Sequence, residues 1–385
     1  MLLKDPPKHL IAQAQSGTGK TAAFSLAILS RLDFNNPSTQ AIVLAPTREL
    51  ARQIVDVMKE LARFTPAIIT QVIPESGQRS EPITGQILIG TPGKLGDMIK
   101  RFVPGSSSNT TRRKFIDVSS VRMLVLDEAD CMLDLQGLLQ QIEMVKRLLP
   151  YNLQLIFFSA TWDDAVFHFA NTFVNKSANR ILLKTFQLSL TSVKQFYIDC
   201  ESEEDRFQVL VGLYGIMTIG QSIIFVKLRE VARKIANRMT DKGHHVSFLH
   251  GHLLPDERDI VMDSFRSGRC KVLVTTNVLA RGIDIERVNM VINYDLPVDK
   301  EDRADPTTYL HRIGRTGRFG RSGVSVNFVH SHSSYSIMNE IAQHHNCPVV
   351  KIPTELDRGD GDTLQDWEDG RLERMEAFFK EHLKK

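Results

Sequence analysis

The sequence predicts an α/β protein in which two parallel β-sheets, each covered by helices on both faces, form two tandem domains. Two observations lead to this prediction: short apolar runs alternate with segments of helical periodicity, and the same alternation starts again halfway along the chain. The length of 385 residues also favours two domains, because one core rarely grows beyond about 250–300 residues. We place the boundary in the polar stretch around 185–191, which gives domains 1–186 and 187–385.

The apolar runs of the first half are short and rich in isoleucine, valine and leucine, as is typical of strands buried on both faces of a parallel sheet. They occupy residues 9–13, 41–46, 67–73, 86–92, 123–130 and 154–161. One helical pattern begins at Lys20, directly after the first run. Another, Arg48–Arg63, places its apolar residues on one face.

The second half repeats this organisation. Its apolar runs are 221–226, 245–251, 271–277, 288–297 and 323–330. A helix is expected after the first of these, and Gly243 is well placed to cap it. The polar segments 104–114 and 357–366 are expected to be surface loops. A last amphipathic helix, which carries Trp367, is expected to pack on the second domain.

The composition is that of an ordinary globular protein, with 42% hydrophobic and 24% charged residues. A net charge of +3 permits a nucleic-acid partner without requiring one. The four cysteines are far apart and include no CxxC pair, which argues against a disulfide framework or a zinc site and favours a reducing compartment. No apolar run approaches 18 residues, and the first residues do not resemble a secretory signal.

The octapeptide AQSGTGKT is the strongest chemical signal in the first half. A phosphate-binding loop needs backbone N–H groups that converge at the start of a helix, and glycines supply the unusual backbone angles for this. The residues of this loop would be Gly17, Thr18, Gly19, Lys20 and Thr21. Lys20 would bring a charge to the β- and γ-phosphates, and Thr21 would offer a hydroxyl to Mg²⁺. Ala14, where the usual pattern has glycine, costs little if this position does not need a positive φ.

The segment VLDEAD, residues 125–130, is an apolar strand that ends in acidic residues. A carboxylate at a strand tip can hold Mg²⁺ opposite a phosphate loop, and Asp127 is the candidate for this role. Glu128 is the candidate to accept a proton from the attacking water.

The stretch HRIGRTGRFGR, residues 311–321, concentrates arginines in the second half. Arg315 and Arg318 are three residues apart and are expected on one helical face. Guanidinium groups that neutralise the γ-phosphate in phosphoryl transfer are worth about 10³–10⁵ in rate. Catalysis would then require the two domains to close on the nucleotide. A simple phosphate-backbone patch is the rival interpretation, and both can hold for different residues.

The histidines His244, His245, His250 and His252 raise the possibility of a metal site. No carboxylate or thiol completes a ligand set, so we expect no metal there.

Seven motifs together resemble the DEAD-box ATP-dependent RNA helicases over essentially the whole chain. In order they are AQSGTGKT (14–21), PTRELA (46–51), TPG (91–93), DEAD (127–130), SAT (159–161), ARGID (280–284) and HRIGRTGR (311–318). The resemblance implies two tandem RecA-like domains. In that family alanine is usual at the first position of the loop. The long segment before the arginine motif is similar to the nuclear-pore mRNA-export branch.

The resemblance also implies roles for individual residues. Besides the phosphate loop, Asp127 would hold Mg²⁺ largely through water, Glu128 would activate water, and Arg315 and Arg318 would be arginine fingers. Nucleotide contacts from the second domain would be Gly282 and Asp284. Residues that relay the nucleotide state to RNA would be Asp130, Ser159, Thr161 and His311. The RNA backbone track would be lined by Pro46, Thr47, Arg48, Thr91, Gly93, Arg258 and Thr275.

The resemblance further implies the substrate, the partners and the location. ATP and Mg²⁺ would be the cofactors, and a single strand or short duplex of mRNA would be bound without sequence preference. In the export branch a nucleoporin and an inositol-hexakisphosphate-dependent activator are partners. A monomer in the cytoplasm and nucleus, at the cytoplasmic face of the pore, is implied.

The sequence departs from the family at its start. The family has an adenine-recognition segment upstream of the phosphate loop, and this sequence begins too close to the loop to contain it. We therefore expect weaker nucleotide affinity, weakened activity and poor discrimination between ATP and GTP. Glu257 also replaces a glutamine that often precedes the residue matching Arg258, with a small expected effect.

Two other functions remain alternatives. An RNA-binding clamp without productive turnover would fit the lack of the adenine-recognition segment. A different phosphate-loop enzyme, such as a small-molecule kinase, would leave the arginines of the second domain without a role.

Overall fold

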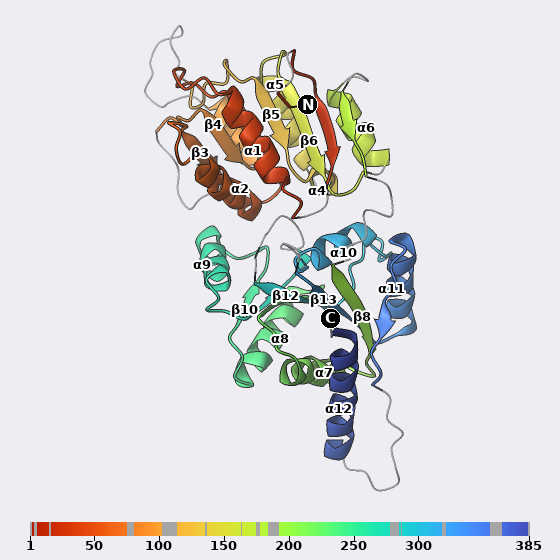
Figure 1. Cartoon of the computed structure of the whole chain (residues 1–385). Helices are drawn as coiled ribbons and strands as arrows, with labels where there is room; N and C mark the ends of the chain where they lie inside the picture. Colours follow the sequence, from red (N-terminus) through yellow and green to blue (C-terminus); the bar gives the residue numbers. More distant parts are fainter. Residues whose placement is uncertain are drawn as a thin grey trace. The chain divides into compact units, whose positions relative to one another are not determined.

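The computed structural model describes residues 2–3, 6–14, 17–74, 81–101, 114–134, 137–162, 164–174, 178–183, 192–277, 285, 287–317, 321–354 and 364–383. For residues 134 and 364–369 only the backbone is described. The chain forms two compact units, each built around one seven-stranded sheet (Figure 1). We describe each unit by itself.

The first sheet is entirely parallel and has the order β3-β4-β2-β5-β6-β1-β7. Its strands are β1 (Leu10–Gln13), β2 (Ala41–Leu44), β3 (Ile69–Val72), β4 (Ile87–Gly90), β5 (Met123–Leu126), β6 (Gln154–Ser159) and β7 (Asn179–Ile181). All six strands predicted in this half are present. The edge strand β7 was not predicted.

The helices of the first unit cover both faces of this sheet. They are α1 (Lys20–Arg31), α2 (Arg48–Leu61), α3 (Pro92–Lys100), α4 (Ala129–Asp134), α5 (Leu138–Leu148) and α6 (Asp164–Phe173). Alternate residues of each strand enter two separate apolar clusters, because side chains along a strand point to opposite faces. Val43 packs in a cluster with α1 and α2, and its neighbour Ile42 packs in a cluster with α3 to α6.

The second sheet is also entirely parallel, with the order β10-β11-β9-β12-β13-β8-β14. Its strands are β8 (Val193–Asp199), β9 (Gln221–Phe225), β10 (Val246–Leu249), β11 (Val272–Thr275), β12 (Val288–Asn293), β13 (Gly323–Val329) and β14 (Val350–Lys351). The two sheets place their strands in the same sequence of crossovers, as tandem RecA-like domains do. The predicted fold class is therefore confirmed.

The helices of the second unit are α7 (Glu203–Ile216), α8 (Arg229–Asp241), α9 (Pro255–Arg266), α10 (Pro306–Ile313), α11 (His332–His344) and α12 (Leu364–Leu383). α7, α8 and α12 share one apolar cluster with the sheet, and α10 and α11 share another. Gly243 follows α8 with φ 88°, as its predicted capping role requires.

The last helix packs on the second unit, as predicted. Met375 and Phe379 are buried in the cluster that α7 and α8 also enter. Arg371 forms an ion pair with Asp205, which lies in the first turn of α7. Leu372 lies so close to Gly212 of α7 that a Cβ there would meet its side chain at 2.3 Å, so only glycine fits without rearrangement.

Several details of the sequence interpretation are corrected or fall outside the described residues. β8, in the interior of the second sheet, was missed. α12 begins at Leu364, so residues 364–366 belong to a helix and not to the loop predicted at 357–366. The remainder of that loop, most of 104–114 and the boundary stretch 185–191 lie outside the described residues.

Buried glutamines bind the amino-terminal edge of the first sheet together. Gln86, Gln40 and Gln154 stand at or directly before the starts of β4, β2 and β6, and each is at most 3% exposed. The amide of Gln86 donates to the carbonyls of Asp33, Phe34 and Asn36. The hydrogen bonds of Gln40 and Gln154 likewise tie neighbouring segments to the edge. Since buried amides must be satisfied, this edge is tightly fixed.

Among the helices that the structure describes, none combines the length and the apolar character that a membrane span needs.

Candidate functional site

The predicted site residues of the first unit gather at the carboxyl edge of its sheet. The strands lie in the order β4-β2-β5-β6-β1. In that order, the predicted site residues at or shortly after their carboxyl ends are Thr91, Pro46, Asp127, Ser159 and the phosphate loop. The residues predicted to line the RNA track thus lie at one end of this row, after β4 and β2. The phosphate loop lies at the other end, after β1. The acidic motif and the SAT motif lie between them. Ligands of parallel sheets bind at this edge.

The phosphate loop has the backbone geometry that the sequence predicts. Gly17 and Gly19 have φ of 77° and 91°, in the left-handed region that favours glycine. Gly19 is the N-cap of α1, and Lys20 and Thr21 open that helix, so the positive end of its dipole faces the loop. Ala14 is not among the residues with positive φ, and its N–H donates to the carbonyl of Ser159 at 3.0 Å. Alanine is therefore unstrained there.

Asp127 is a buried carboxylate at the tip of β5. It is 2% exposed, and its Oδ1 accepts a hydrogen bond from the N–H of Glu128 at 3.0 Å. Burial raises the pKa of Asp127 to about 6, although the nearby Lys20 ammonium acts to lower it. Neighbouring groups only partly offset the cost of burying this negative charge, so a bound cation would fit beside it. Thr21 adds a hydroxyl oxygen, a type of ligand that Mg²⁺ prefers.

Glu128 follows in a strained backbone conformation. Its φ of 55° is one of only a few positive values among the described non-glycine residues. The side chain is 6% exposed, and its Oε2 has no hydrogen-bond partner within the described part of the chain. A buried, unsatisfied carboxylate oxygen is costly to keep, which indicates a ligand-directed role.

The buried charge of Asp127 leads to a prediction for the ligand-free protein. The pKa of Asp127 in the folded protein, about 6, exceeds the ordinary 3.8. Ionisation of Asp127 therefore lowers the free energy of unfolding by its full amount above pH 6, and it has no effect below about pH 4. The variant Asp127→Asn should therefore raise the free energy of unfolding at pH 8 by on the order of 2 kcal/mol.

Urea unfolding in EDTA at pH 8 and at pH 4.5 measures this gain. It should shrink at the lower pH. Asp164→Asn, at an exposed position of α6, is the matched control and should change little. A variant no more stable than the parent at pH 8 would contradict the assignment of a buried, ionised Asp127.

Asp130 joins the acidic motif to the SAT motif. Its Oδ2 accepts hydrogen bonds from the N–H and the hydroxyl of Thr161, at 3.1 and 2.7 Å. Its own N–H donates to the hydroxyl of Ser159 at 3.2 Å. A change at the tip of β5 can therefore be transmitted directly to the tip of β6.

The N-termini of α2 and α3 lie beside each other, at the end of the row that carries the residues predicted to line the RNA track. α2 begins after Thr47, whose hydroxyl accepts from the N–H of Leu50, and Pro46 and Arg48 flank it. α3 begins after Thr91, whose side chain makes no capping bond. The two helices follow β2 and β4, which are hydrogen-bonded neighbours. Such a pair of N-termini suits phosphate oxygens.

Gly93 lies in the first turn of α3. A Cβ at this position would meet the amide oxygen of Gln141 on α5 at 2.7 Å, so a larger residue would displace that side chain.

The arginine motif of the second unit is partly buried. α10 ends at Ile313 with Gly314 as its C-cap, so Arg315 lies just beyond the helix. The prediction of one helical face for Arg315 and Arg318 is therefore wrong for Arg315. The turn is nevertheless fixed, because Arg315 is 2% exposed and its Nε donates to the carbonyl of His311 at 2.9 Å.

Arg312 is a residue whose role the sequence interpretation missed. Its guanidinium is 1% exposed and donates to the Asn277 and Asn293 side chains and to the Asp295 carbonyl. It also lies over the ring of Phe225, 4.9 Å from the centroid. Burial lowers the pKa of Arg312 to about 9. It thereby connects α10 to the ends of β9, β11 and β12.

The other candidates of the second unit vary in accessibility. Thr275 is fully buried, and its hydroxyl lies 3.0 Å from the carbonyls of Leu249 and Thr276. A direct RNA contact by this side chain would require rearrangement. Arg258 is half-buried in the first part of α9, and His311 is 3% exposed. The predicted residues Gly282, Asp284 and Arg318 lie outside the described residues.

Among the described residues, no three histidine, cysteine, aspartate or glutamate side chains lie together in a group that could hold a metal ion. His250 stacks on Phe248, and its Nδ1 accepts from the N–H of His252.

This combination of two RecA-like sheets, a phosphate loop and an adjacent acidic strand tip defines a nucleotide-driven helicase core. The DEAD/DEAH box helicase family model matches residues 2–169, and the model for the helicase conserved C-terminal domain matches residues 205–320. The chain belongs to the DEAD/DEAH box helicase family.

Within this family the chain is similar to the Dbp5 proteins. It is 51% identical to the ATP-dependent RNA helicase dbp5 of Schizosaccharomyces pombe, over 92% of this chain and 68% of that protein. A structure of a Saccharomyces cerevisiae Dbp5 variant bound to RNA and ADP–BeF3 has a TM-score of 0.87 and 46% identity, and the match covers 100% and 91% of the two chains. A Dbp5 variant bound to Nup159, Gle1, IP6 and ADP matches with a TM-score of 0.67 and 43% identity, over 100% and 92%. The predicted resemblance to the mRNA-export branch is confirmed.

Proposed function

We propose that this chain is an ATP-dependent RNA helicase that binds the RNA backbone without sequence preference and remodels short duplexes or RNA–protein complexes when its two domains close. The observation that carries this proposal is the row of strand tips in the first unit. There the phosphate loop, the acidic motif and two helix N-termini suited to RNA occupy one sheet edge. We place the domain boundary between 186 and 187, close to the division of the chain into compact units after residue 184.

The nucleotide would be held by the phosphate loop. Successive N–H groups from Gly17 to Lys20 bind phosphate oxygens at the start of α1. Asp127 and Thr21 hold Mg²⁺, with Asp127 acting partly through water. When bound, Mg²⁺ neutralises the charge that develops on the phosphates. Gly282 and Asp284 complete the nucleotide contacts.

Hydrolysis would use two groups from different parts of the chain. Glu128 accepts a proton from the attacking water through its unsatisfied carboxylate oxygen. Arg315 and Arg318 stabilise the negative charge of the transferred phosphoryl group.

RNA would lie along the residues at the tips of β2 and β4. The part of the track in the first unit is formed by Pro46, Thr47, Arg48, Thr91 and Gly93. Arg258 forms the part in the second unit, together with Thr275 once a rearrangement exposes its buried side chain. Contacts to phosphates and 2′-hydroxyls carry no sequence information. Asp130, Ser159, Thr161 and His311 would transmit the nucleotide state to this track.

The cellular role would be mRNA export. The similarity to Dbp5 in complex with Nup159, Gle1 and IP6 supports a nucleoporin and an inositol-hexakisphosphate-dependent activator as partners. We infer work at the cytoplasmic face of the nuclear pore, in a protein found in cytoplasm and nucleus.

RNA-stimulated ATP hydrolysis and ATP-dependent separation of a short RNA duplex test this function. The variant Thr161→Val keeps the shape of the side chain and removes the hydroxyl that donates to Asp130. The rate of strand separation should fall by about tenfold or more beyond any fall in the rate of ATP hydrolysis. The reason is that the charge-assisted hydrogen bond from Thr161 to Asp130 is lost. Tight RNA binding with no turnover by the parent chain would instead favour an RNA clamp.

A further inference from the structure

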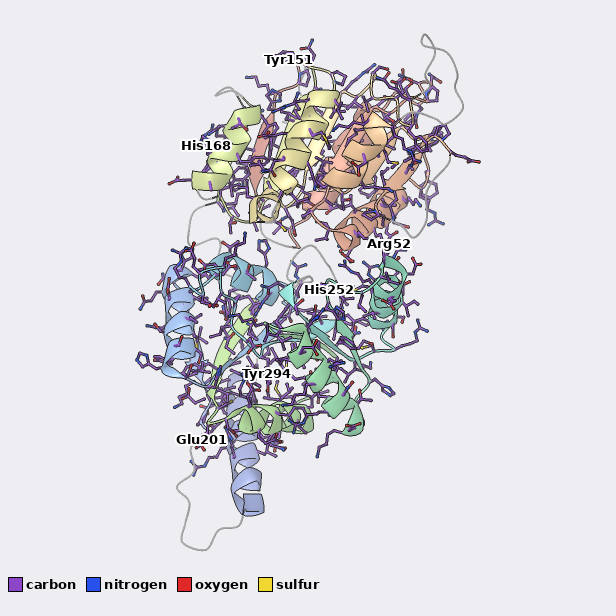
Figure 2. All side chains as sticks on the ribbon, turned by 180° about the vertical axis from the view of Figure 1, so that it is seen from behind. Arg52, Tyr151, His168, Glu201, His252 and Tyr294 are labelled. Atoms are coloured by element: carbon purple, nitrogen blue, oxygen red, sulfur yellow. The ribbon has the colours of Figure 1, made fainter. Side chains whose placement is uncertain are left out.

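A large cavity lies at the amino-terminal edge of the first sheet, the edge opposite the strand tips of the candidate site. Its volume is about 820 Å³, and its lining includes residues at or directly before the starts of β1, β2, β5 and β6. Figure 2 shows Tyr151, which also lines it, at the opposite end of the first unit from Arg52 of α2. Pockets of about 300–1,000 Å³ are typical of small-molecule sites.

Within the part of the chain that the structure describes, the charged residues of the lining are all basic. Arg31 comes from the last turn of α1, Lys146 from the last turn of α5, and Arg122 directly precedes β5. His9 directly precedes β1. Among the described residues of the lining, none carries a carboxylate. Throughout the described ranges, neither Arg122 nor Lys146 forms an ion pair. A cavity of this kind attracts anions.

Two of these basic groups are partly removed from water. Burial lowers the pKa of Lys146, and burial followed by the charge of Lys146 lowers the pKa of His9. Desolvation disfavours a charged group, and a nearby anion would reverse that effect.

Two neutral polar side chains of the cavity, Gln154 and Gln40, are already hydrogen-bonded. Gln154 accepts from Arg31 at 3.0 Å and donates to the carbonyls of Leu2 and Lys8, and Gln40 is bonded to the segment after α1. His9 Nδ1 accepts from the N–H of Leu155 at 3.1 Å, so Nε2 is the ring nitrogen left to donate. The donors that a ligand could engage include those of Arg122, Lys146 and His9, beside the exposed Tyr151 hydroxyl and Asn152 amide, and a phosphate suits such donors.

Apart from Asn152, the rest of the described lining is apolar or aromatic. Ile28 and Leu32 come from the end of α1, and Phe173 is the last residue of α6. Tyr151 is 93% exposed and offers an aromatic face to a ligand. A ligand that fills this cavity therefore needs an apolar or aromatic body as well as its anionic group.

We propose that this cavity binds a small phosphate ester with an aromatic or apolar body, at a site distinct from the nucleotide site at the opposite edge. The proposal does not depend on the helicase function, because every lining residue lies in the first unit and none belongs to the phosphate loop or the RNA track.

Pyridoxal 5′-phosphate is a suitable probe, because it carries a phosphate on an aromatic ring and forms an imine with a nearby lysine amine, with loss of water. The full chain, saturated with ADP and Mg²⁺ to protect Lys20, would be incubated with the probe, reduced with borohydride and analysed by peptide mapping. Labelling is expressed relative to that of the exposed Lys59, which cancels the lower intrinsic reactivity of pyridoxal, whose aldehyde is held as an internal hemiacetal. The relative labelling of Lys146 should be about tenfold greater than with pyridoxal, which lacks the phosphate and its charge-assisted contacts.

Two variants separate a built site from general attraction. Arg122→Glu should reduce the labelling of Lys146 about tenfold, because it removes one phosphate contact and adds repulsion. Arg147→Glu is the matched control. Its side chain is 80% exposed, pairs with Glu143 and does not line the cavity, so labelling should remain within about twofold.

Equal labelling of Lys146 by pyridoxal and by its phosphate would overturn the proposal. An equal loss of Lys146 labelling in Arg122→Glu and Arg147→Glu would overturn it as well. Protection of Lys146 by single-stranded RNA, without protection by a small phosphate ester such as uridine monophosphate, would also overturn it. That result would indicate a polynucleotide surface.

Discussion

Replacing Glu128 with glutamine should reduce RNA-stimulated ATP hydrolysis by about 10²–10⁴-fold, the usual contribution of a general base. The amide keeps the size of the carboxylate but cannot accept the proton of the attacking water. Glu128 is not one of the phosphate-loop residues, so binding of ATP should persist. Single-turnover phosphate release and equilibrium binding of a fluorescent ATP analogue separate these two effects.

The control for this variant is Glu60→Gln, an exposed glutamate near the end of α2. It should behave as the parent chain does. Hydrolysis by Glu128→Gln at the parent rate would remove Glu128 from the mechanism. A simultaneous loss of binding and hydrolysis, with altered circular dichroism, would instead indicate that the strained turn at φ 55° had refolded.

Replacing Arg315 with glutamine should lower the rate of hydrolysis by about 10³-fold, at the lower end of the range for arginine fingers. On the proposed role of Arg315, the charge lost would stabilise the transition state, so the effect should appear in kcat more than in KM. Because Arg315 is 2% exposed and bonded to the His311 carbonyl, its position is already set by the fold. Steady-state kinetics with saturating RNA measure both constants.

A second substitution distinguishes charge from geometry. Arg315→Lys keeps the charge but not the planar fork, so it should recover only part of the activity. Arg233→Gln, an exposed arginine of α8 paired with Glu230, is the control and should have no effect. Full activity in Arg315→Lys would show that a point charge suffices at this position.

Much of the fold could be predicted because parallel strands buried on both faces have a strong compositional pattern. β5, for example, is wholly buried and reads as an uninterrupted apolar run. β8 was missed because its burial alternates, and its sequence VKQFYID mixes charged and aromatic residues. The start of α12 was misplaced because a polar segment with glycines resembles a loop until the packing of Met375 and Phe379 is known.

The candidate site was predictable where backbone chemistry restricts the residue type. The positive φ values of Gly17 and Gly19 are an example, since the glycines in the motif anticipate them. Arg312 was not predictable in the same way. In sequence it is one arginine among several, and its burial follows from acceptors contributed by β11 and β12, which lie far from it along the chain. Tertiary partners of this kind leave no local pattern.

The burial of Arg312 has a consequence for hydrogen exchange and local unfolding. The Arg312 guanidinium donates to Asn277, Asn293 and the Asp295 carbonyl. When α10 separates from the sheet, these hydrogen bonds must break and the charged side chain must move into water. Opening α10 alone should therefore require nearly as much free energy as unfolding the whole unit. Its amide protons should exchange among the slowest in the chain. His311 and Arg315, on either side of Arg312, should therefore keep their positions until the second unit unfolds.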